Sequence, residues 1–289
     1  MPPDLTLGID GGGTGCRARI RDGAGQVRGE AQGGPANIYQ DFNGALATIL
    51  ITAQAAADKA GVALAELRAG LGLAGATGPE QCRRVLSAGL PFAGLRVESD
   101  GFTACLGAHG GQDGGIVIAG TGSAGLALVA GQRINMGGHG FMLGDQGSGA
   151  VMGRELLRCA LLAHDGLMPA SDLTRAVMAE FSDSPGRMIE WSRSAVSRDY
   201  ARFAPQAFVA AQAGDAVGRA IVTQAATGLA AIARQLLMAG APRLSLIGGL
   251  AGAFLPYLPA AMTQALQPAL ADAVDGAIMM AQQPALAPA

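Results

Sequence analysis

Residues 5–14 read Leu5-Thr6-Leu7-Gly8-Ile9-Asp10-Gly11-Gly12-Gly13-Thr14, an apolar run that ends in a carboxylate, three glycines and a hydroxyl. The pattern predicts a buried strand followed by a tight turn. Because three consecutive residues lack a Cβ, their peptide N–H groups can approach an anion closely. A second strand, Cys16–Asp22, follows directly, whereas the P-loop and the dinucleotide fingerprint both open a helix. The hairpin therefore predicts phosphate binding of another kind, with an ordinary turn as the alternative.

The composition indicates a globular chain without a polyanionic or membrane partner. Its 289 residues suffice for two modest domains, and 50% hydrophobic against 15% charged residues allow a substantial core. A net charge of −2 gives no electrostatic reason to expect nucleic acid or an acidic membrane surface. The apolar segment Ile221–Leu237 contains Gln224 and Arg234, so we expect a core helix rather than a membrane span.

The N-terminal segment and the cysteines favour a reducing compartment. No basic segment followed by an apolar stretch opens the chain, so a signal peptide is not expected. The four cysteines are far apart and form no CxxC pair, which argues against a zinc site or a disulfide framework. They are Cys16, Cys82, Cys105 and Cys159. We expect a cytoplasmic protein.

The first half of the chain predicts a mixed sheet with helices on both faces. Three strands with Gly-rich turns are followed by a helix and then by alternating strands and short helices. The expected strands are 5–9, 16–22, 27–32, 69–74 and 95–99, and the expected helices include 41–60 and 101–108.

The pattern of strand, Gly/Thr turn and strand returns in the second half. Strands are expected at 116–119 and 124–129, around the turn Gly120-Thr121-Gly122-Ser123. This weak repetition is what a gene-duplicated two-domain protein would show. The region 148–240 is mostly helical by its pattern, and a last strand at 244–247 runs into Gly248-Gly249.

Four polar or glycine-rich segments each follow a predicted strand. They are Asp10–Thr14, Asp100, Gly120–Ser123 and Gly248–Leu250. Strand ends that face a common cleft are where ligands bind in α/β folds. Two hydroxyl-bearing turns, one from each half, could hold the β- and γ-phosphates of a nucleotide, and the last glycine pair leaves room for a base and ribose.

Six segments in order resemble the sugar kinase, actin and heat-shock chaperone superfamily. The chain is most similar to the branch that holds N-acetylglucosamine kinases, bacterial glucosamine kinases and the activator ATPases of 2-hydroxyacyl-CoA dehydratases. The segments are Gly8–Thr14, Gly33–Asn37, Ser99-Asp100, Ile118–Ser123, Gly144–Gly149 and Gly248-Gly249. The resemblance implies an α/β fold of two actin-like ATPase (ribonuclease H-like) domains with an interdomain cleft. Residues 1–112 with 276–289 would form the sugar-binding domain, and 113–275 the nucleotide-binding domain.

The resemblance also assigns roles to residues. The phosphate loops would be Asp10, Gly11, Gly12, Gly13 and Thr14, and Gly120, Thr121, Gly122 and Ser123. Adenosine would contact Gly248, Gly249 and Leu250, Mg²⁺ would be organised by Asp10, and Asp100 would be the catalytic base that also touches the sugar. The sugar would be held by Asn37 and Asp145, with Gly75 and His139 as weaker candidates.

Each of these residues also has a purely structural interpretation. Asp100 and Asp145 precede predicted helices and could be capping or turn residues. Asn37 lies in a Pro/Gly loop and could be a turn residue, and Gly75 could simply end a strand. Asp10 could simply stabilise the hairpin, and His139 could simply occupy a position in its turn.

The favoured function is an ATP-dependent kinase for the 6-hydroxyl of glucosamine or N-acetylglucosamine, with ATP and Mg²⁺ and a homodimer implied by the resemblance. His139 stands where the kinases usually carry Trp, and Gln146 replaces a common Glu, so the choice of sugar stays open. One alternative is an activator ATPase with an iron–sulfur cluster shared between two subunits. Another is a sugar-sensing module without turnover.

Overall fold

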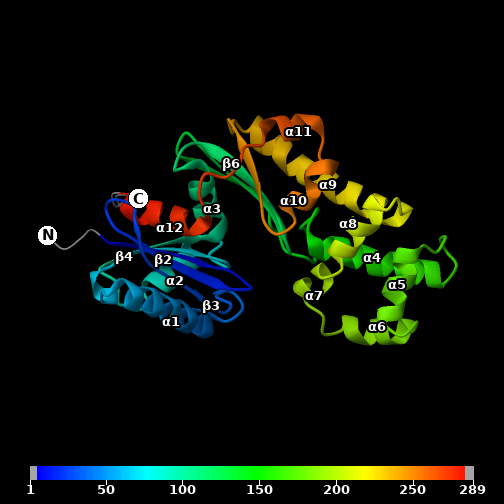
Figure 1. Ribbon diagram of the computed structural model, residues 1–289, viewed down its shortest axis with the longest axis horizontal. Helices are drawn as coiled ribbons and strands as arrows, with labels where there is room; N and C mark the ends of the chain where they lie inside the picture. The colour runs from blue at the N-terminus through cyan, green and yellow to red at the C-terminus, as the bar shows by residue number, and fades with distance from the viewer. Residues whose placement is uncertain (1–4, 284–289) are drawn as a thin grey trace. The chain divides into compact units, whose positions relative to one another are not determined.

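The structure is a computed structural model in which residues 5–283 are described. The chain divides into two compact units, each with its own sheet (Figure 1). The first unit comprises the described residues up to Gly114 together with those from Pro268 onward. The second unit comprises Gly115–Gln267. The chain thus leaves the first unit once and returns to it near its end.

A five-stranded mixed sheet forms the first unit, in the order β3-β2-β1-β4-β5. Strands β1, β2 and β3 form an antiparallel meander, and β4 and β5 run parallel to β1. The bounds are β1 Thr6–Gly11, β2 Cys16–Arg21, β3 Val27–Gly33, β4 Arg68–Leu73 and β5 Gly94–Ser99. The β1 side chains are buried almost throughout, as expected for a central strand covered on both faces.

Helices cover both faces of this sheet (Figure 1). Helix α1 (Phe42–Ala60) lies on one face, and α3 (Asp100–His109) and α12 (Ala273–Gln282) lie on the other. The connections hold the short helices η1 (Leu64–Glu66) and α2 (Pro79–Leu86). Helix α1 begins where the Asp41 carboxylate accepts a hydrogen bond from the Gly44 amide, and it ends at Gly61 in the left-handed region.

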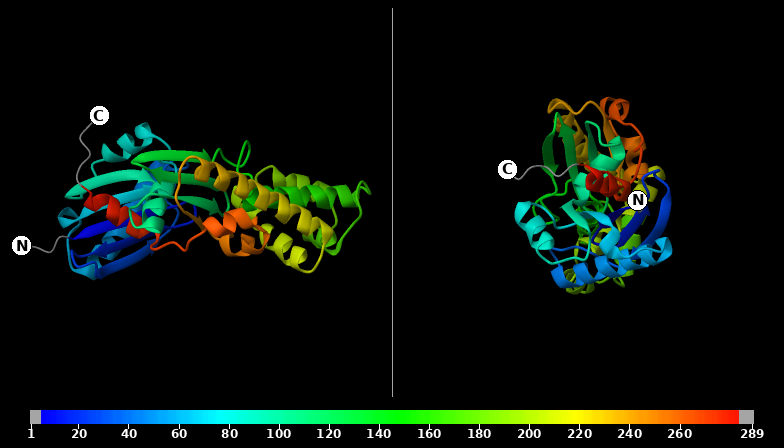
Figure 2. Two further views of the ribbon diagram at one scale, coloured as in Figure 1. Left: turned by 90° about the horizontal axis from the view of Figure 1, so that it is seen from above. Right: turned by 90° about the vertical axis from the view of Figure 1, so that its left-hand side faces the viewer.

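Glycines let α12 approach the sheet and α3 without an intervening layer of side chains. A Cβ on Gly8 of β1 would lie 2.2 Å from the Val274 carbonyl oxygen of α12. A Cβ on Gly276 of α12 would lie 1.8 Å from the Thr103 carbonyl oxygen of α3. Figure 2 shows α12, in red, beside the strands of this sheet from two directions.

The second unit repeats the strand arrangement in a shorter form. Its sheet has the order β8-β7-β6-β9, with β9 parallel to β6 and β7 antiparallel to β8. The bounds are β6 Gly114–Ala119, β7 Ser123–Val129, β8 Gln132–Gly137 and β9 Leu244–Ile247. A meander of three strands with a parallel fourth strand beside the first therefore occurs in both units.

The rest of the second unit is helical. Its helices are α4 Gly149–His164, α5 Asp172–Glu180, α6 Pro185–Ser192, α7 Ser197–Ala201, α8 Ala204–Gln212, α9 Ala216–Met238, α10 Ala251–Phe254, η2 Leu255–Tyr257 and α11 Ala260–Ala265. Within residues 5–283, α9 is the one helix whose length and apolarity would allow it to cross a membrane. It packs on α8, α4 and β7 and buries Val222, Leu229 and Leu236 completely, which agrees with the predicted core helix.

The predicted strands and long helices are confirmed to within two or three residues, and the mixed first sheet is confirmed as well. One strand, β8, was not predicted. Most of its side chains are exposed or half-buried, because it is an edge strand that begins Gln132-Arg133. Only two apolar residues, Ile134 and Met136, alternate with polar ones in it, and so short a pattern does not distinguish a strand from a loop.

Candidate functional site

Each of the five strands of the first sheet has one of its ends at the same side of the sheet, near the predicted phosphate turn. In the parallel part, Gly11, Leu73 and Ser99 lie at the same level, where β1, β4 and β5 end. In the meander, Gly11 pairs with Cys16 of β2, which pairs with Gly33 of β3. The predicted site residues of the first unit come directly after these strand ends, so the topology brings them together. They are the Asp10–Thr14 turn, the loop after Gly33, Gly75 and Asp100.

The glycine turn itself is closed by its own backbone. The amide of Gly12 donates to the carbonyl of Gly15 at 2.8 Å, which leaves Gly13 and Thr14 exposed at the tip. A Cβ on Gly13 would meet no atom within 4 Å, so open space lies in front of the peptide. An anion could therefore reach the amides and the Thr14 hydroxyl at this tip.

Asp10 lies at the base of the turn and is held by an arginine of the next strand. Arg17 Nη2 is 2.7 Å and Nε 3.3 Å from the same oxygen, Oδ2 of Asp10. Partial burial alone would lower the pKa of the Arg17 guanidinium, but its hydrogen bond to Asp10 and the nearby carboxylates raise it above its usual value. Asp10 is thus paired, as the bracing interpretation requires, while its second oxygen Oδ1 has no partner among the described residues.

Asn37 and Gly75 are brought together by backbone hydrogen bonds to the sheet edge. The Ile38 amide donates to the Ala74 carbonyl, and the Ala74 amide donates to the Gly11 carbonyl. The Asn37 Oδ1 accepts from the amides of Tyr39 (2.9 Å) and Gln40 (3.3 Å), an Asx turn. This fixes the carboxamide, whose Nδ2 has no hydrogen-bond partner within residues 5–283.

Asp100 is the first residue of α3, and the capping role belongs to its neighbour. The Ser99 hydroxyl accepts from the Phe102 amide at 3.2 Å, so Ser99 is the N-cap. The half-buried Asp100 accepts from the Gly101 amide at 2.8 Å through Oδ1. Its carboxylate is therefore stabilised by the positive end of the helix at the carboxyl edge of the sheet.

A magnesium ion fits this edge only as part of a nucleotide complex. No group of three or more potential ligands gathers anywhere in the described part of the chain. Mg²⁺ is commonly held by one or two carboxylates together with substrate phosphates and water, rather than by an all-protein cage. The chemistry of Asp10 Oδ1 beside an open glycine turn suits that kind of site.

In the second unit, the Gly120–Ser123 turn is tied to the start of α4. The amides of Gly149 and Ala150 donate to the carbonyls of Gly120 (2.8 Å) and Thr121 (3.1 Å). The buried Ser123 hydroxyl donates to the Gln146 carbonyl at 2.8 Å. Thr121 is exposed, so its hydroxyl, rather than that of Ser123, faces solvent at this turn.

Asp145 is buried against the same turn. It adopts a left-handed backbone conformation (φ 61°), and its carboxylate accepts backbone hydrogen bonds from Gly140 and Ser123. Burial raises the pKa of Asp145 above its usual value, although the two hydrogen bonds and the nearby His139 act in the opposite direction. The N-cap of α4 is Ser148, so the capping interpretation of Asp145 does not hold.

The Gly248–Leu250 segment closes the same edge of the second sheet. The Leu250 amide donates to the Ala119 carbonyl, the last residue of β6, at 3.0 Å. Gly248 has φ 103°, and a Cβ there would lie 2.4 Å from the same carbonyl oxygen. The predicted adenosine segment and the predicted second phosphate turn therefore both lie at the end of β6.

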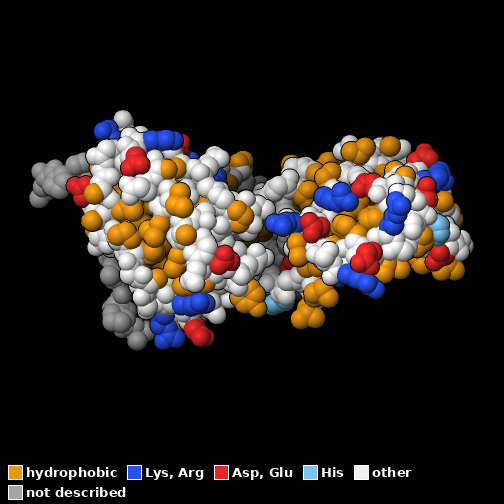
Figure 3. Space-filling view, turned by 90° about the horizontal axis from the view of Figure 1, so that it is seen from below, with side chains coloured by type: hydrophobic (Ala, Val, Ile, Leu, Met, Phe, Trp, Pro, Cys, Tyr) orange, Lys and Arg blue, Asp and Glu red, His pale blue; other side chains and the backbone are white. Residues whose placement is uncertain are grey.

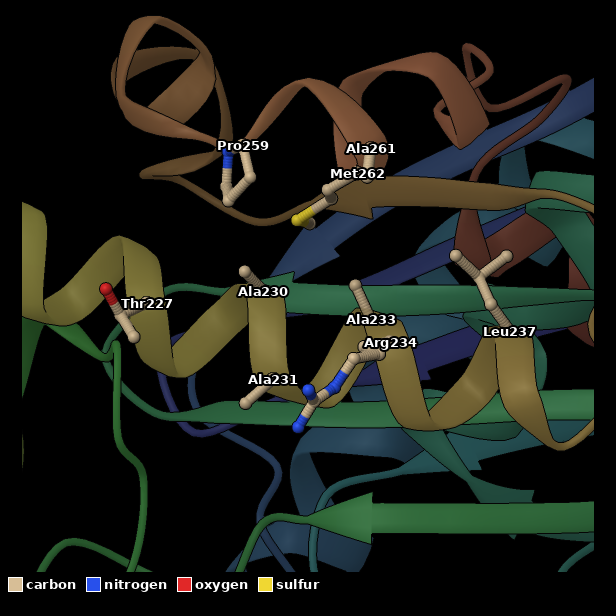
Figure 4. A pocket seen from close by; sticks show the side chains of 9 residues that line it. All are labelled: Thr227, Ala230, Ala231, Ala233, Arg234, Leu237, Pro259, Ala261 and Met262. Carbon is tan, nitrogen blue, oxygen red and sulfur yellow. The ribbon is translucent and has the colours of Figure 1, made fainter.

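An apolar pocket in the second unit was not predicted. It has a volume of about 330 Å³ and lies between α9 and α11 (Figure 4). Its lining consists of Thr227, Ala230, Ala231, Ala233, Arg234, Leu237, Pro259, Ala261 and Met262. None of the predicted site residues lines it. On the face drawn in Figure 3, acidic and basic side chains are interspersed within each unit.

The two sheets, with the same strand order and a glycine turn at the edge of each, define the class of actin-like ATPases. The model of the BadF/BadG/BcrA/BcrD ATPase family matches residues 7–286, and the chain belongs to that family. It is 39% identical over 281 residues to the glucosamine kinase GspK of Vibrio cholerae, with 96% of each chain covered. A solved structure of a candidate N-acetylglucosamine kinase from Chromobacterium violaceum is 35% identical, covers 97% of this chain and 99% of its own, and superposes with a TM-score of 0.91.

More distant structures share the fold. Component A of the (R)-2-hydroxyglutaryl-CoA dehydratase from Acidaminococcus fermentans is 13% identical, covers 96% of both chains and has a TM-score of 0.51. The resemblance drawn from the motifs to a branch that holds both sugar kinases and dehydratase activators is thereby confirmed.

Proposed function

We propose that this protein is an ATP-dependent kinase that transfers the γ-phosphate to the 6-hydroxyl of glucosamine or N-acetylglucosamine. The observation that carries the proposal is that predicted site residues follow neighbouring strand ends of the first sheet. There the register aligns the ends of β1, β4 and β5, which carry the Asp10 turn, Gly75 and Asp100. The similarity to a glucosamine kinase along nearly the whole chain supports it.

Asp100 would act as the base that orients the sugar hydroxyl. Phosphoryl transfer has a loose transition state, so catalysis depends mainly on positioning and charge stabilisation. The hydroxyl becomes acidic only as its bond to phosphorus forms, so an ordinary carboxylate suffices. The helix start and the Gly101 amide hold the carboxylate of Asp100 in one orientation.

Asn37, Gly75 and Asp145 would recognise the sugar. The Asn37 carboxamide, fixed through its Oδ1, offers its Nδ2 donor to a hydroxyl oxygen. His139 is exposed beside Asp145, so a ring could contact the sugar from the second unit.

ATP would be held by both glycine turns and by the Gly248–Leu250 segment, with Asp10 and Thr14 nearest its magnesium. When bound, Mg²⁺ neutralises charge on the phosphates. Thr121 supplies the exposed hydroxyl of the second turn, while Ser123 supports that turn through Gln146. A cytoplasmic location, expected from the cysteines, and a homodimer, implied by the resemblance, belong to the same proposal.

A coupled assay tests the substrate. The full chain is given ATP and Mg²⁺ with glucosamine, N-acetylglucosamine, glucose or no sugar, and ADP release is followed. We expect release that depends on an amino sugar. Turnover of glucose alone, with neither amino sugar accepted, contradicts the proposed substrate.

The two alternatives predict other outcomes of this assay. A sugar-sensing module would bind sugar and consume no ATP. An activator ATPase would be brown and oxygen-sensitive, with its cluster ligands at a surface shared by two chains. Cys16, Cys105 and Cys159 are instead buried, and burial raises the pKa of Cys16 to about 11, so these thiols are poorly placed for such a cluster.

A further inference from the structure

Arg17 is the side chain that fixes the orientation of the Asp10 carboxylate. The two residues face each other in the register of β1 and β2. Both contacts of the guanidinium, Nη2 at 2.7 Å and Nε at 3.3 Å, go to Oδ2 of Asp10. One carboxylate oxygen is therefore fixed, and Oδ1 is left without a partner among residues 5–283. The Asp10 side chain is 21% exposed, so its carboxylate is accessible to an incoming group.

A second carboxylate fixes Arg17 from the other side. Its Nη1 lies 3.2 Å from Oδ2 of Asp272. Asp272 is the N-cap of α12, where its Oδ1 accepts from the Asp275 amide at 3.0 Å. The guanidinium is thus held between β1 and the start of α12, and its position does not depend on Asp10 alone.

The geometry points to Arg17 as a positioning residue that orients Asp10 toward the magnesium of a bound nucleotide. The inference rests on the proposed function, because that function supplies the metal–nucleotide complex. Hydrogen-bonded partners of metal-binding carboxylates fix the carboxylate in one orientation, and their loss costs about 10- to 100-fold in metal affinity or activity. Arginine suits this role better than lysine because its planar donors hold a defined angle.

Arg19 provides a matched control on the same strand. It contacts Asp272 (3.1 Å), Asp275 (2.9 Å) and Glu30, and it makes no contact with Asp10. Arg19→Gln therefore removes a charge and weakens the attachment of α12 while leaving the Asp10–Arg17 pair in place.

The test measures binding rather than turnover. Mn²⁺ binding in the presence of ADP is followed by electron paramagnetic resonance on the full-length wild type, Arg17→Gln, Arg17→Lys and Arg19→Gln. For Arg17→Gln we expect the dissociation constant to rise about 10- to 100-fold. Arg17→Lys should recover part of that loss, and Arg19→Gln should bind as the wild type does. In an Asp10→Asn background, Arg17→Gln should have no further effect, because Arg17 acts through Asp10.

Two outcomes overturn the inference. One is wild-type Mn²⁺ affinity in Arg17→Gln, and the other is an equal loss in Arg19→Gln, which would assign the effect to the attachment of α12. Arg17→Lys keeps the charge and guards against a variant that does not fold. If the Arg17 effect is found but no sugar is phosphorylated, the inference stands and the kinase proposal fails.

Discussion

Gly75 lies directly against Asn37: a Cβ atom placed on Gly75 would come within 2.9 Å of the Asn37 Oδ1. The same Cβ would lie 2.7 Å from the Tyr39 amide nitrogen, which donates to that oxygen. The loop that carries Asn37 therefore fits onto the end of β4 only because residue 75 has no side chain. This relationship joins two residues that the proposed function assigns to the sugar.

Gly75→Ala should therefore impair sugar use more than it impairs folding. Gly75 has φ 91°, so alanine costs about 1–2 kcal/mol of backbone strain before the overlap with Asn37 is counted. We expect the KM for the amino sugar to rise about 10-fold or more, equivalent to 1.4 kcal/mol. Steady-state kinetics and urea unfolding measure the two effects.

Gly89→Ala is the control for Gly75→Ala. Gly89 also has a positive φ, 68°, but its Cβ would meet no atom within 4 Å. The Gly89→Ala variant should lose stability through backbone strain alone and keep the wild-type KM for the amino sugar. An unchanged KM in Gly75→Ala would remove this contact from sugar recognition.

Asp100→Asn should abolish most turnover while preserving the fold. Asparagine keeps the shape and the hydrogen bond from the Gly101 amide but cannot take a proton. We expect kcat to fall about 10²- to 10⁴-fold with ATP affinity nearly unchanged. Asp58→Asn is the control, because it removes the same charge from a carboxylate of α1 that accepts a hydrogen bond from Gln54. Retained activity in Asp100→Asn would exclude the base role.

Asp145 should leave a recognisable pH dependence in the stability. Because burial raises its folded pKa above the ordinary value of 3.8, the native state binds a proton that the unfolded state has released. The resulting stabilisation is complete below that ordinary value and is lost as the pH rises through the raised folded value. The wild type should therefore lose stability over this window.

Asp145→Asn should remove that loss without straining the backbone, since asparagine tolerates the left-handed conformation. Denaturant unfolding at several pH values from 3.5 upward should show that the free energy of unfolding of the variant increases relative to that of the wild type as the pH rises. Asp172→Asn, at a fully exposed carboxylate of the same unit, serves as the reference. Parallel pH profiles for Asp145→Asn and the wild type would contradict the expectation.

Gly276→Ala should be among the more damaging substitutions outside the site. Its Cβ would lie 1.8 Å from the Thr103 carbonyl oxygen, so α12 and α3 must separate. We expect a loss of about 3 kcal/mol in the free energy of unfolding. Gly252→Ala in α10, where a Cβ meets no atom within 4 Å, should be neutral or stabilising by about 0.5 kcal/mol. Equal stabilities would show that the two helices adjust freely.

Local patterns sufficed for most of the fold. Buried strands such as β1 and β6 combine apolar runs with glycine turns, and both signals lie within a few residues. The edge strand β8 was missed because only two of its residues, Ile134 and Met136, are apolar and pack against the core. The capping of α3 by Ser99 rather than Asp100 also went unpredicted, since the two neighbours are equally good caps by type.

The candidate site was predicted only where its residues follow strands. Strand ends are visible in the sequence, and the register of the sheet then aligns them. Partners that come from elsewhere are not visible: Arg17 and Asp272 are 255 residues apart, and no local pattern links them. The burial of Asp145 against the Gly120–Ser123 turn likewise depends on how the loop after β8 folds back.

The return of α12 to the first unit has a consequence for how the protein is made. On the ribosome, the strands of the first sheet emerge well before α12, because all of Gly115–Gln267 is synthesised between them. Until then the glycine-lined face that receives α12, including Gly8 and Gly70, stays uncovered. The nascent first unit therefore remains incomplete until the last helix has been synthesised, and its folding can finish only then.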